Sequence, residues 1–213
     1  MRSAIVFCGG GPSRVRFEIP EDAFVVAADI GLAEANRLGV RVHLLVGDLD
    51  SVSADDLGAF EEAGGEVRRH PEDKDATDLD LAIAAAIETG AERVLVVGGD
   101  GGRLDHLLGN ALVLASPDHA GAELDAVFGA ARLHVVRGSR KLTGSEGELI
   151  SLFALGGPAT GVSTHGLRWA LDDSALRPGS SLGVSNEFIG PSASIEVREG
   201  VVLAVRPGFE ALP

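Results

Sequence analysis

The sequence has 213 residues, of which 45% are hydrophobic, so the chain can bury a sizeable core in one large domain or two modest ones. Its formal net charge of −14 argues against nucleic acid or an anionic membrane as a partner. The single cysteine, Cys8, excludes an internal disulfide and agrees with a reducing compartment. No apolar run approaches the ~20 residues of a membrane span. We therefore expect a soluble cytoplasmic protein, whose start, MRSAIVFCGGGP, is typical of a first strand and a glycine turn rather than of a signal peptide.

The first ~130 residues alternate short apolar runs with helical patterns. Nearly continuous apolar runs at 4–8, 24–28, 42–46 and 94–98 are typical of strands that are covered on both faces. This β-α-β rhythm predicts an α/β domain with a doubly wound, mostly parallel sheet.

Two helices of this region carry polar residues of interest. The first begins at Thr77, where Asp80 three residues later resembles a capping box, and ends at Gly90. Its apolar positions follow helical spacing: Leu79, Ala82, Ile83, Ala86 and Ile87.

The second helix follows GGDGG and ends at Pro117. One stripe is apolar: Leu104, Leu107, Leu108, Ala111, Leu112 and Ala115. Arg103, His106 and Asn110 share a polar face beside this stripe, and Asp105 lies on its other edge.

Helical periodicity disappears after about residue 138, and short strand-like pieces recur between Gly, Pro and Ser turns. Glu199-Gly200 resembles a two-residue hairpin turn between the last two pieces. We predict two domains, an α/β catalytic domain over 1–138 and a small all-β sandwich over 139–213.

Polar segments follow several of the predicted strands or begin helices. They are CGGGP, VGDLDSV, KDATD and GGDGGRLDH. In an open α/β sheet, ligands bind beyond the carboxyl ends of the strands, so we expect these segments to converge on one site. Neither lysine, Lys74 or Lys141, follows a glycine, which excludes a Gly-Lys-Ser/Thr phosphate loop.

The aspartates of these segments repel one another unless a proton, a cation or water lies between them. Oxygen ligands without nearby cysteine or paired histidine suit Mg²⁺, Mn²⁺ or Ca²⁺ rather than zinc. Glycine turns and helix N-termini supply N–H groups for phosphates, and Arg103 after the glycines is a candidate guanidinium for a phosphoryl oxygen. The set predicts phosphoryl transfer. Taken singly, Asp48 or Asp50 can cap a turn, Asp78 can serve the helix dipole, and Arg103 can form a surface ion pair.

Several segments resemble the thiamine pyrophosphokinase family. They are GDLDSV (47–52), KDATDLDLAI (74–83), GGDGGRLDHLLGN (98–110), THGLRWAL (164–171) and GVSNEF (183–188). The resemblance covers nearly the whole chain in the right order. It implies transfer of pyrophosphate from ATP to the thiamine hydroxyl, which gives thiamine diphosphate and AMP, with Mg²⁺, in a homodimer that binds thiamine between subunits.

The resemblance also implies residue roles. The catalytic and metal-site candidates are Asp48, Asp50, Asp75 and Asp78, with Arg103 as a further catalytic residue. The ATP side is expected to include Asp29, Lys74, Thr77, Asp105, His106 and Asn110. On the thiamine side, Trp169 would stack on the pyrimidine, and Ser185 with Asn186 would hydrogen-bond it.

The sequence departs from the family pattern at two places. The family's ADGGA is ADIGL here, so that Ile30 stands where Gly is expected, and the usual Pro-Asp is Val42-His43. A β-branched side chain at position 30 would narrow the nucleotide pocket or shift a turn that needs a positive φ.

Two other functions compete with this one. Pyrophosphoryl transfer to another heterocyclic alcohol, such as a hydroxymethylpterin, is disfavoured by Trp169 and Asn186 in the β domain. A regulator that binds a nucleotide or thiamine without catalysis is disfavoured because every expected carboxylate is present.

Overall fold

The computed structural model describes residues 2–11, 13 and 17–208, so Pro12 of the CGGGP segment lies outside the described residues. The chain forms two compact units. Unit 1 comprises Met1–Val113 and Gly121–Gly129, and unit 2 comprises Leu114–Ala120 and Ala130–Pro213. None of the described helices has the length and apolarity that a bilayer span requires.

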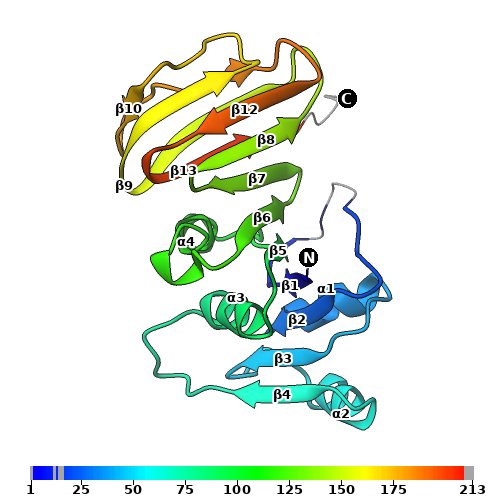
Figure 1. Ribbon diagram of the computed structural model, residues 1–213. Coiled ribbons are helices and arrows are strands. Elements are labelled where there is room, and N and C mark those ends of the chain that lie inside the picture. The colour runs from blue at the N-terminus through cyan, green and yellow to red at the C-terminus, as the bar shows by residue number, and fades with distance from the viewer. Residues whose placement is uncertain (1, 12, 14–16, 209–213) are drawn as a thin grey trace. The chain divides into compact units, whose positions relative to one another are not determined.

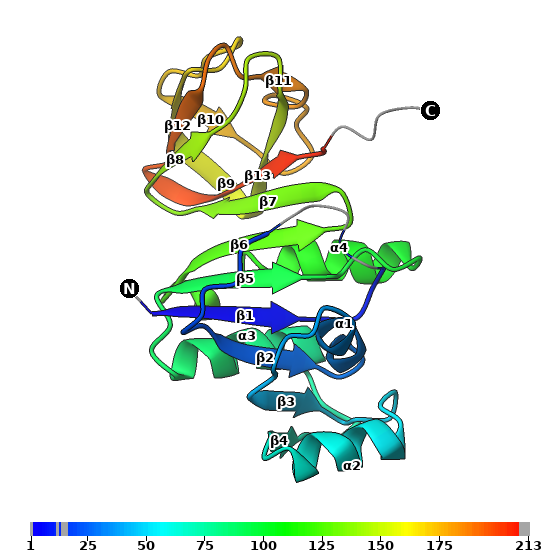
Figure 2. The same cartoon turned by 90° about the vertical axis from the view of Figure 1, so that its right-hand side faces the viewer.

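Unit 1 is built on a parallel sheet. Its strands are β1 (Ser3–Phe7), β2 (Phe24–Ala28), β3 (Leu44–Gly47), β4 (Glu66–Arg69), β5 (Arg93–Val97) and β6 (Glu123–Phe128). They lie in the order β4-β3-β2-β1-β5-β6, with parallel pairing between all neighbours. The order reverses beside β1, and the arrows in Figure 2 point the same way, so the carboxyl ends of the strands share one edge.

The buried strands are the ones that the apolar runs predict. β1, β2 and β5 lie within one residue of the predicted bounds, and β3 begins two residues later than expected. Every residue of β3 is buried, and only the first residue of β1 and of β2 is partly exposed. The α/β fold class with a mostly parallel sheet is therefore confirmed for this unit.

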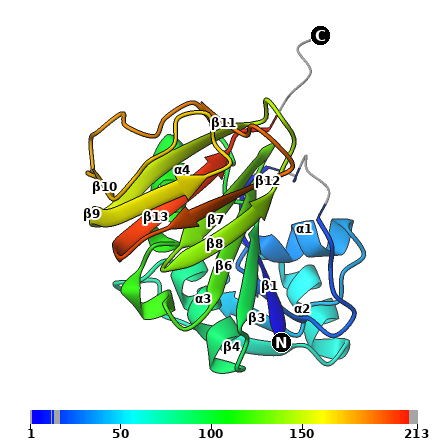
Figure 3. The ribbon, with the colours of Figure 1, turned by 45° about the horizontal axis from the view of Figure 1, so that its top comes forward.

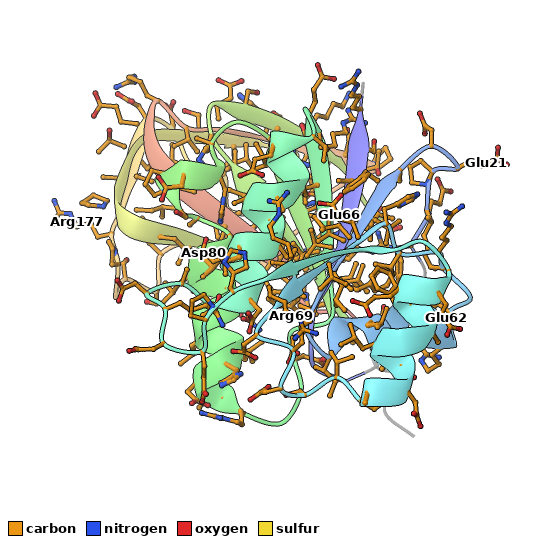
Figure 4. The ribbon with its side chains drawn as sticks, turned by 90° about the horizontal axis from the view of Figure 1, so that it is seen from below. Glu21, Glu62, Glu66, Arg69, Asp80 and Arg177 are labelled. Carbon is orange, nitrogen blue, oxygen red and sulfur yellow. The ribbon has the colours of Figure 1, made fainter. Side chains whose placement is uncertain are left out.

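The edge strand β4 was not predicted, because its residues are polar. It reads EVRR, and its two end residues, Glu66 and Arg69, are exposed. Figure 4 labels both side chains, and also Glu62 at the end of α2. Charged side chains on an edge strand discourage pairing with the sheet of another molecule.

Helices cover both faces of the sheet. They are α1 (Gly31–Arg37), α2 (Ala54–Glu62), α3 (Asp78–Glu88) and α4 (Leu104–Val113). In Figure 1, α3 and α4 lie on one face, and α1 and α2 on the other. α3 contributes much of the core because Leu79, Ala82, Ile83, Ala85 and Ala86 are buried.

The two predicted helices differ in how far their patterns agree with the structure. Thr77 is the N-cap of α3, and its hydroxyl accepts a hydrogen bond from the Asp80 amide, as predicted. α4 contains no buried residue, and its apolar stripe is largely exposed: Leu104 68%, Leu108 57% and Leu112 56%. Amphipathic spacing predicted this helix correctly but did not reveal that its apolar face is uncovered.

Unit 2 is antiparallel. Its strands are β7 (Ala131–Val136), β8 (Ser139–Thr143), β9 (Leu149–His165), β10 (Ser174–Leu176), β11 (Asn186–Glu187), β12 (Ser192–Glu196) and β13 (Glu199–Arg206), and a short helix η1 (Pro117–His119) belongs to the same unit. β9 is long enough to pair with β13, β10, β11 and β12 (Figure 3). The strands enclose a core that includes Ile150, Leu152, Phe188 and Ile195. The predicted all-β second domain is therefore confirmed in class.

Two details of this unit differ from the sequence-based expectations. The hairpin turn predicted at Glu199-Gly200 is wrong, since both residues belong to β13, which pairs with β7 and β9, whereas β12 pairs with β8 and β9. The units divide at Gly129 and Ala130, while the predicted domain boundary lies near Gly138. The difference arises because β7 pairs with β13 of unit 2.

Candidate active site

A pocket of about 410 Å³ opens at the carboxyl edge of the parallel sheet. The turns after β1, β2, β3 and β5 and the first residues of α3 and α4 all contribute to its wall. The lining residues are Cys8, Gly9, Gly10, Ala28, Asp29, Ile30, Ser51, Thr77, Asp78, Leu79, Gly99, Gly101, Asp105, His106, Gly109 and Asn110. The predicted polar segments thus converge as expected for an open α/β sheet.

Three aspartates lie together at this edge. Asp29 follows β2, and Asp48 and Asp50 follow β3; each offers a carboxylate oxygen within 4.8 Å of the other two. Asp48 and Asp50 are bonded to their own loop, because Asp48 Oδ1 accepts the Asp50 amide at 3.3 Å and the Ser51 hydroxyl donates to Asp50 Oδ1 at 2.8 Å. We call Asp29, Asp48 and Asp50 the acidic cluster.

Lys74 connects the cluster to the start of α3. Its Nζ lies 2.8 Å from Asp48 Oδ2 and 3.1 Å from Asp78 Oδ1. The hydrogen bond from Lys74 lowers the pKa of Asp48, and the same contact with Asp48 raises the pKa of Lys74. The cation therefore favours the ionised form of Asp48.

Asp29 is a partly buried member of the cluster. Burial raises the pKa of its carboxyl group, and the negative charges of Asp78 and Asp50 raise it further, while hydrogen bonds from Ile30 and Ser51 oppose the shift. Its Oδ1 is buried and has no hydrogen-bond partner among the described residues. A buried carboxylate oxygen of this kind is open to a cation.

Two glycine turns meet at the floor of the pocket. A Cβ atom on Gly10 would lie 2.6 Å from the Gly99 nitrogen and 2.8 Å from the Asp100 nitrogen, and one on Gly101 would lie 2.4 Å from the Gly10 Cα. The turns after β1 and β5 can approach this closely because both lack side chains at the contact. The Gly99 amide already donates to the Gly9 carbonyl at 2.9 Å, so the other backbone amides of these turns are the ones suited to phosphate oxygens.

α4 supplies a polar wall. Asp105, His106 and Asn110 line the pocket, and Asn110 Nδ2 donates to the Gly99 carbonyl at 3.2 Å, which ties the helix to the glycine turn. Arg103 is exposed and pairs with Asp105, a contact that lowers the pKa of Asp105 to about 2. Arg103 is therefore engaged with a carboxylate at the rim and does not line the pocket.

Ile30 is a wall residue rather than a source of backbone strain. Its φ is −58°, and the positive φ of 47° falls on Asp29, so the expected shift of a positive-φ turn does not occur. Its side chain is 50% exposed, and its Cγ2 would lie 2.6 Å from a Cβ placed on Gly9. The side chain narrows the pocket against the first glycine turn, the other outcome expected from the sequence.

The predicted residues are not all brought together. Asp48, Asp50 and Asp29 form the cluster, and Lys74 joins Asp78 to it. Asp75 is exposed and lies outside both the cluster and the pocket lining. The role of each residue stays a prediction.

Sequence reasoning missed Ser51, which lines the pocket and bonds two of the aspartates. It stands inside GDLDSV, where a hydroxyl next to the second aspartate was the available signal.

The remaining predicted residues lie in unit 2, around a separate pocket of about 610 Å³. Trp169, Ser185 and Asn186 are among its lining residues. Trp169 is 55% exposed, whereas Asn186 is 2% exposed and bonds the backbone of Trp169. Ser185 has a positive φ of 57°, and its amide donates to the Ser151 hydroxyl at 3.0 Å.

The structure combines a parallel α/β unit, which has carboxylates and glycine turns at its carboxyl edge, with an antiparallel β unit that has its own pocket. This architecture is typical of a two-domain phosphoryl-transferring enzyme. Two family models match the chain: "Thiamin pyrophosphokinase, catalytic domain" over residues 18–125, and "Thiamin pyrophosphokinase, vitamin B1 binding domain" over residues 133–202. The chain therefore belongs to the thiamine pyrophosphokinase family.

Individual relatives agree with this assignment. Thiamine pyrophosphokinase 1 of Arabidopsis thaliana is 30% identical over 194 residues, covering 83% of this chain and 68% of the relative. Thiamine pyrophosphokinase of Bacillus subtilis is 24% identical over 203 residues, covering 92% and 95%. Its crystal structure matches with a TM-score of 0.83 at 22% identity, covering 98% of this chain and 100% of that chain. The structure of thiamin pyrophosphokinase from Geobacillus thermodenitrificans matches with a TM-score of 0.81 at 27% identity, covering 99% of each chain.

These findings confirm the predicted family and the prediction that the chain is a thiamine pyrophosphokinase enzyme. They favour neither a pterin-type pyrophosphokinase nor a non-catalytic regulator.

Proposed function

We propose that this chain transfers a pyrophosphoryl group from ATP to the hydroxyl of thiamine in a Mg²⁺-dependent reaction, giving thiamine diphosphate and AMP. The observation that carries the site assignment is the acidic cluster, within 4.8 Å, beside a glycine-walled pocket. The cluster would let a chain with a net charge of −14 hold a polyphosphate, because a divalent cation bound there would compensate both the carboxylates and the phosphates.

The acidic cluster suits Mg²⁺ by its donor chemistry. It offers carboxylate oxygens, which this hard cation prefers, and the buried Asp29 Oδ1 still lacks a partner among the described residues. Asp29, Asp48 and Asp50 would hold the ion, with Asp78 close by through Lys74. When bound, Mg²⁺ neutralises charge on the phosphate oxygens and aligns them for displacement.

The residues of the pocket would position ATP. The backbone amides of the glycine turns and the N-terminus of α3 would donate to phosphate oxygens. His106 and Asn110 would shape the wall on the α4 side, and Arg103 would turn from Asp105 to a phosphoryl oxygen at the rim. Lys74 and Thr77 would hold neighbouring side chains in place.

The chemistry is a displacement at phosphorus. The thiamine hydroxyl oxygen forms a bond to the β-phosphorus, and the bond from that phosphorus to the oxygen bridging to the α-phosphate breaks. AMP leaves with the electron pair, and the hydroxyl proton is released to solvent. Catalysis then rests on alignment and charge neutralisation rather than on a covalent intermediate with the protein.

The pocket of unit 2 would bind thiamine. The exposed indole of Trp169 offers a flat surface for the pyrimidine ring, and Ser185 offers polar contacts on the same wall. An aromatic surface also suits the positive charge of the thiazolium ring.

We further propose a cytoplasmic homodimer with thiamine bound between subunits. The exposed leucines of α4 and the exposed apolar residues Leu182, Val184 and Ile189 of unit 2 support a second protein surface. The single reduced cysteine, Cys8, and the use of ATP support the cytoplasm.

The test is product analysis. Purified protein with Mg²⁺, ATP and thiamine should release AMP and thiamine diphosphate in equal amounts, and chelation of the metal should abolish the signal. A hydroxymethylpterin in place of thiamine should give no AMP. Release of ADP, or tight thiamine binding without any turnover across several divalent metals, would refute the proposal.

A further inference from the structure

Asn186 and Trp169 lie side by side in unit 2 but differ sharply in exposure. Trp169 is 55% exposed on the wall of the pocket, and Asn186 is 2% exposed behind it. A buried side-chain amide must find hydrogen-bond partners inside the protein, and its partners reveal what it holds.

The side-chain amide of Asn186 forms hydrogen bonds with both the backbone N–H and the backbone carbonyl of Trp169. Asn186 Oδ1 accepts the Trp169 amide at 3.1 Å and the Glu187 amide at 2.9 Å, and its Nδ2 donates to the Trp169 carbonyl at 2.8 Å. These contacts use three of the four hydrogen-bond positions that an asparagine amide offers. With 2% of the residue exposed, little of Asn186 is left to touch a ligand.

A second set of contacts joins the same two segments. The Arg168 amide donates to the Glu187 carbonyl at 2.9 Å, and the Arg168 guanidinium lies 3.2 Å from Glu187 Oε2. The guanidinium is 5.7 Å from the centre of the Trp169 ring. Glu187 thus compensates the cation next to the indole, so a positively charged ligand does not meet an unpaired arginine there.

We infer that Asn186 is a positioning residue of the thiamine pocket, which fixes the backbone of Trp169 so that the exposed indole is held ready on the pocket wall. This inference rests on the proposed function and assigns Asn186 a role other than direct contact with thiamine. The physical gain is preorganisation, because an indole that is already held in place loses less freedom when a ring stacks on it.

The chain offers a clean probe of this role. Trp169 is the only tryptophan and the sequence has no tyrosine, so fluorescence excited near 295 nm reports this side chain alone. In the Asn186→Ala variant without ligand, we expect lower fluorescence anisotropy and stronger quenching by acrylamide than in the wild type. The thiamine KM should rise roughly tenfold with kcat changed by less than about threefold, the cost of ordering one loosened side chain.

Thr89→Val is the matched control. Thr89 lies in unit 1, outside the pocket of unit 2, and its hydroxyl donates to the Ala86 carbonyl at 2.7 Å, so this variant also loses a partly buried bond from a side chain to the backbone. It should lower stability as Asn186→Ala does, but leave the anisotropy of Trp169 and the thiamine KM near their wild-type values. Equal changes in both variants would mean that Asn186 is merely structural and would overturn the inference.

Hydrogen exchange in the wild type decides the matter even if Asn186→Ala does not fold. The Trp169 amide, although its side chain is exposed, should be protected at least ~100-fold relative to an unstructured peptide. Exchange of this amide at the rate of an unstructured peptide would mean that Asn186 does not hold the Trp169 backbone, and would refute the inference. Because exchange and anisotropy are measured without substrates, they separate failure of this inference from failure of the proposed reaction, which the AMP assay reports.

Discussion

Replacing Lys74 with methionine tests the electrostatics of the site in the absence of any ligand. Lys74 Nζ lies 2.8 Å from Asp48 and 3.1 Å from Asp78, and the side chains of the three residues are 13%, 17% and 26% exposed. Methionine keeps most of the aliphatic volume and removes the charge. The variant therefore leaves Asp48 and Asp78 near Asp29 and Asp50 without their cation.

The expected cost follows from the geometry. At an effective dielectric of about 20, contacts of this length correspond to gross Coulomb energies of about 5 to 6 kcal/mol each. Desolvation cancels most of this, so exposed pairs contribute about 0 to 1 kcal/mol, and breaking a fully buried pair costs about 3 to 5 kcal/mol. The Lys74 contacts lie between these limits, and we expect Lys74→Met to lower the free energy of unfolding by about 2 kcal/mol at pH 7.

The pH dependence identifies the cause. Lys74 lowers the pKa of Asp48, so the folded state keeps this carboxylate ionised at a pH where the unfolded chain, with a pKa of about 3.9, takes up a proton. The stabilisation is thus present above that value and is lost as the pH falls through the lower pKa of the folded state. The difference between wild type and variant should be full at pH 7 and shrink towards pH 3.

The assay is urea unfolding followed by far-ultraviolet circular dichroism between pH 3 and pH 8. Arg68→Met is the matched control, because Arg68 lies 2.8 Å from Glu88 but the side chains are 41% and 64% exposed. Its effect should stay within about 0.5 kcal/mol. A Lys74→Met variant as stable as the wild type at pH 7, or a difference that does not change with pH, would refute the electrostatic account.

The other predictions concern activity. Asp48→Asn should lower kcat for AMP release by at least about a hundredfold while circular dichroism stays unchanged, because a ligand of the proposed ion is lost; near-normal activity would contradict its place in the site. Trp169→Ala should raise the thiamine KM more than it lowers kcat, and an unchanged KM would reject stacking. Ile30→Ala should change the KM for ATP by about threefold or more, because Ile30 lines the pocket at 50% exposure. Leu38→Ala is the control, since Leu38 is 39% exposed and does not line that pocket, and it should leave the KM for ATP unchanged. The reverse result would remove Ile30 from the nucleotide wall.

Sequence reasoning succeeded where the determinants are local. The cap of α3 needs only Thr77 and an amide three residues later, and both lie within one turn of the chain. The apolar runs of β1, β2 and β5 are continuous because these strands are covered on both faces. The convergence of the aspartates followed from a general property of parallel sheets rather than from the residues themselves.

It failed where residues distant in sequence decide the conformation. One of the two effects considered for Ile30 was the shift of a turn that needs a positive φ, but the positive φ falls on Asp29. Gly31 is required there for another reason, since a Cβ at this position would lie 2.2 Å from the Phe7 carbonyl oxygen on the neighbouring strand. The letters ADIGL alone do not show that β1 lies so close to position 31.

The same limit applies in unit 2. Glu199-Gly200 has the composition of a hairpin turn, yet both residues continue β13, where Glu199 pairs with Thr160 of β9. Asn186 belongs to a dipeptide that by itself indicates only a turn, and its partner Trp169 is 17 residues away. A side chain that bonds to a distant backbone leaves no periodic signal, so its role becomes visible only in three dimensions.

The position of Lys74 also explains how an acidic site can stay ready for a metal. The negative charges of Asp48 and Asp78 lie close to each other and to the rest of the site, and Lys74 lies between these two carboxylates. Lys74 favours the ionised form of Asp48, and a divalent ion can bind a carboxylate without first displacing a proton. Burial raises the pKa of Asp29, whereas Lys74 lowers that of Asp48, so Asp29 takes up a proton before Asp48 as the pH falls. The affinity for Mg²⁺ should therefore decrease with falling pH through Asp29 before it decreases through Asp48.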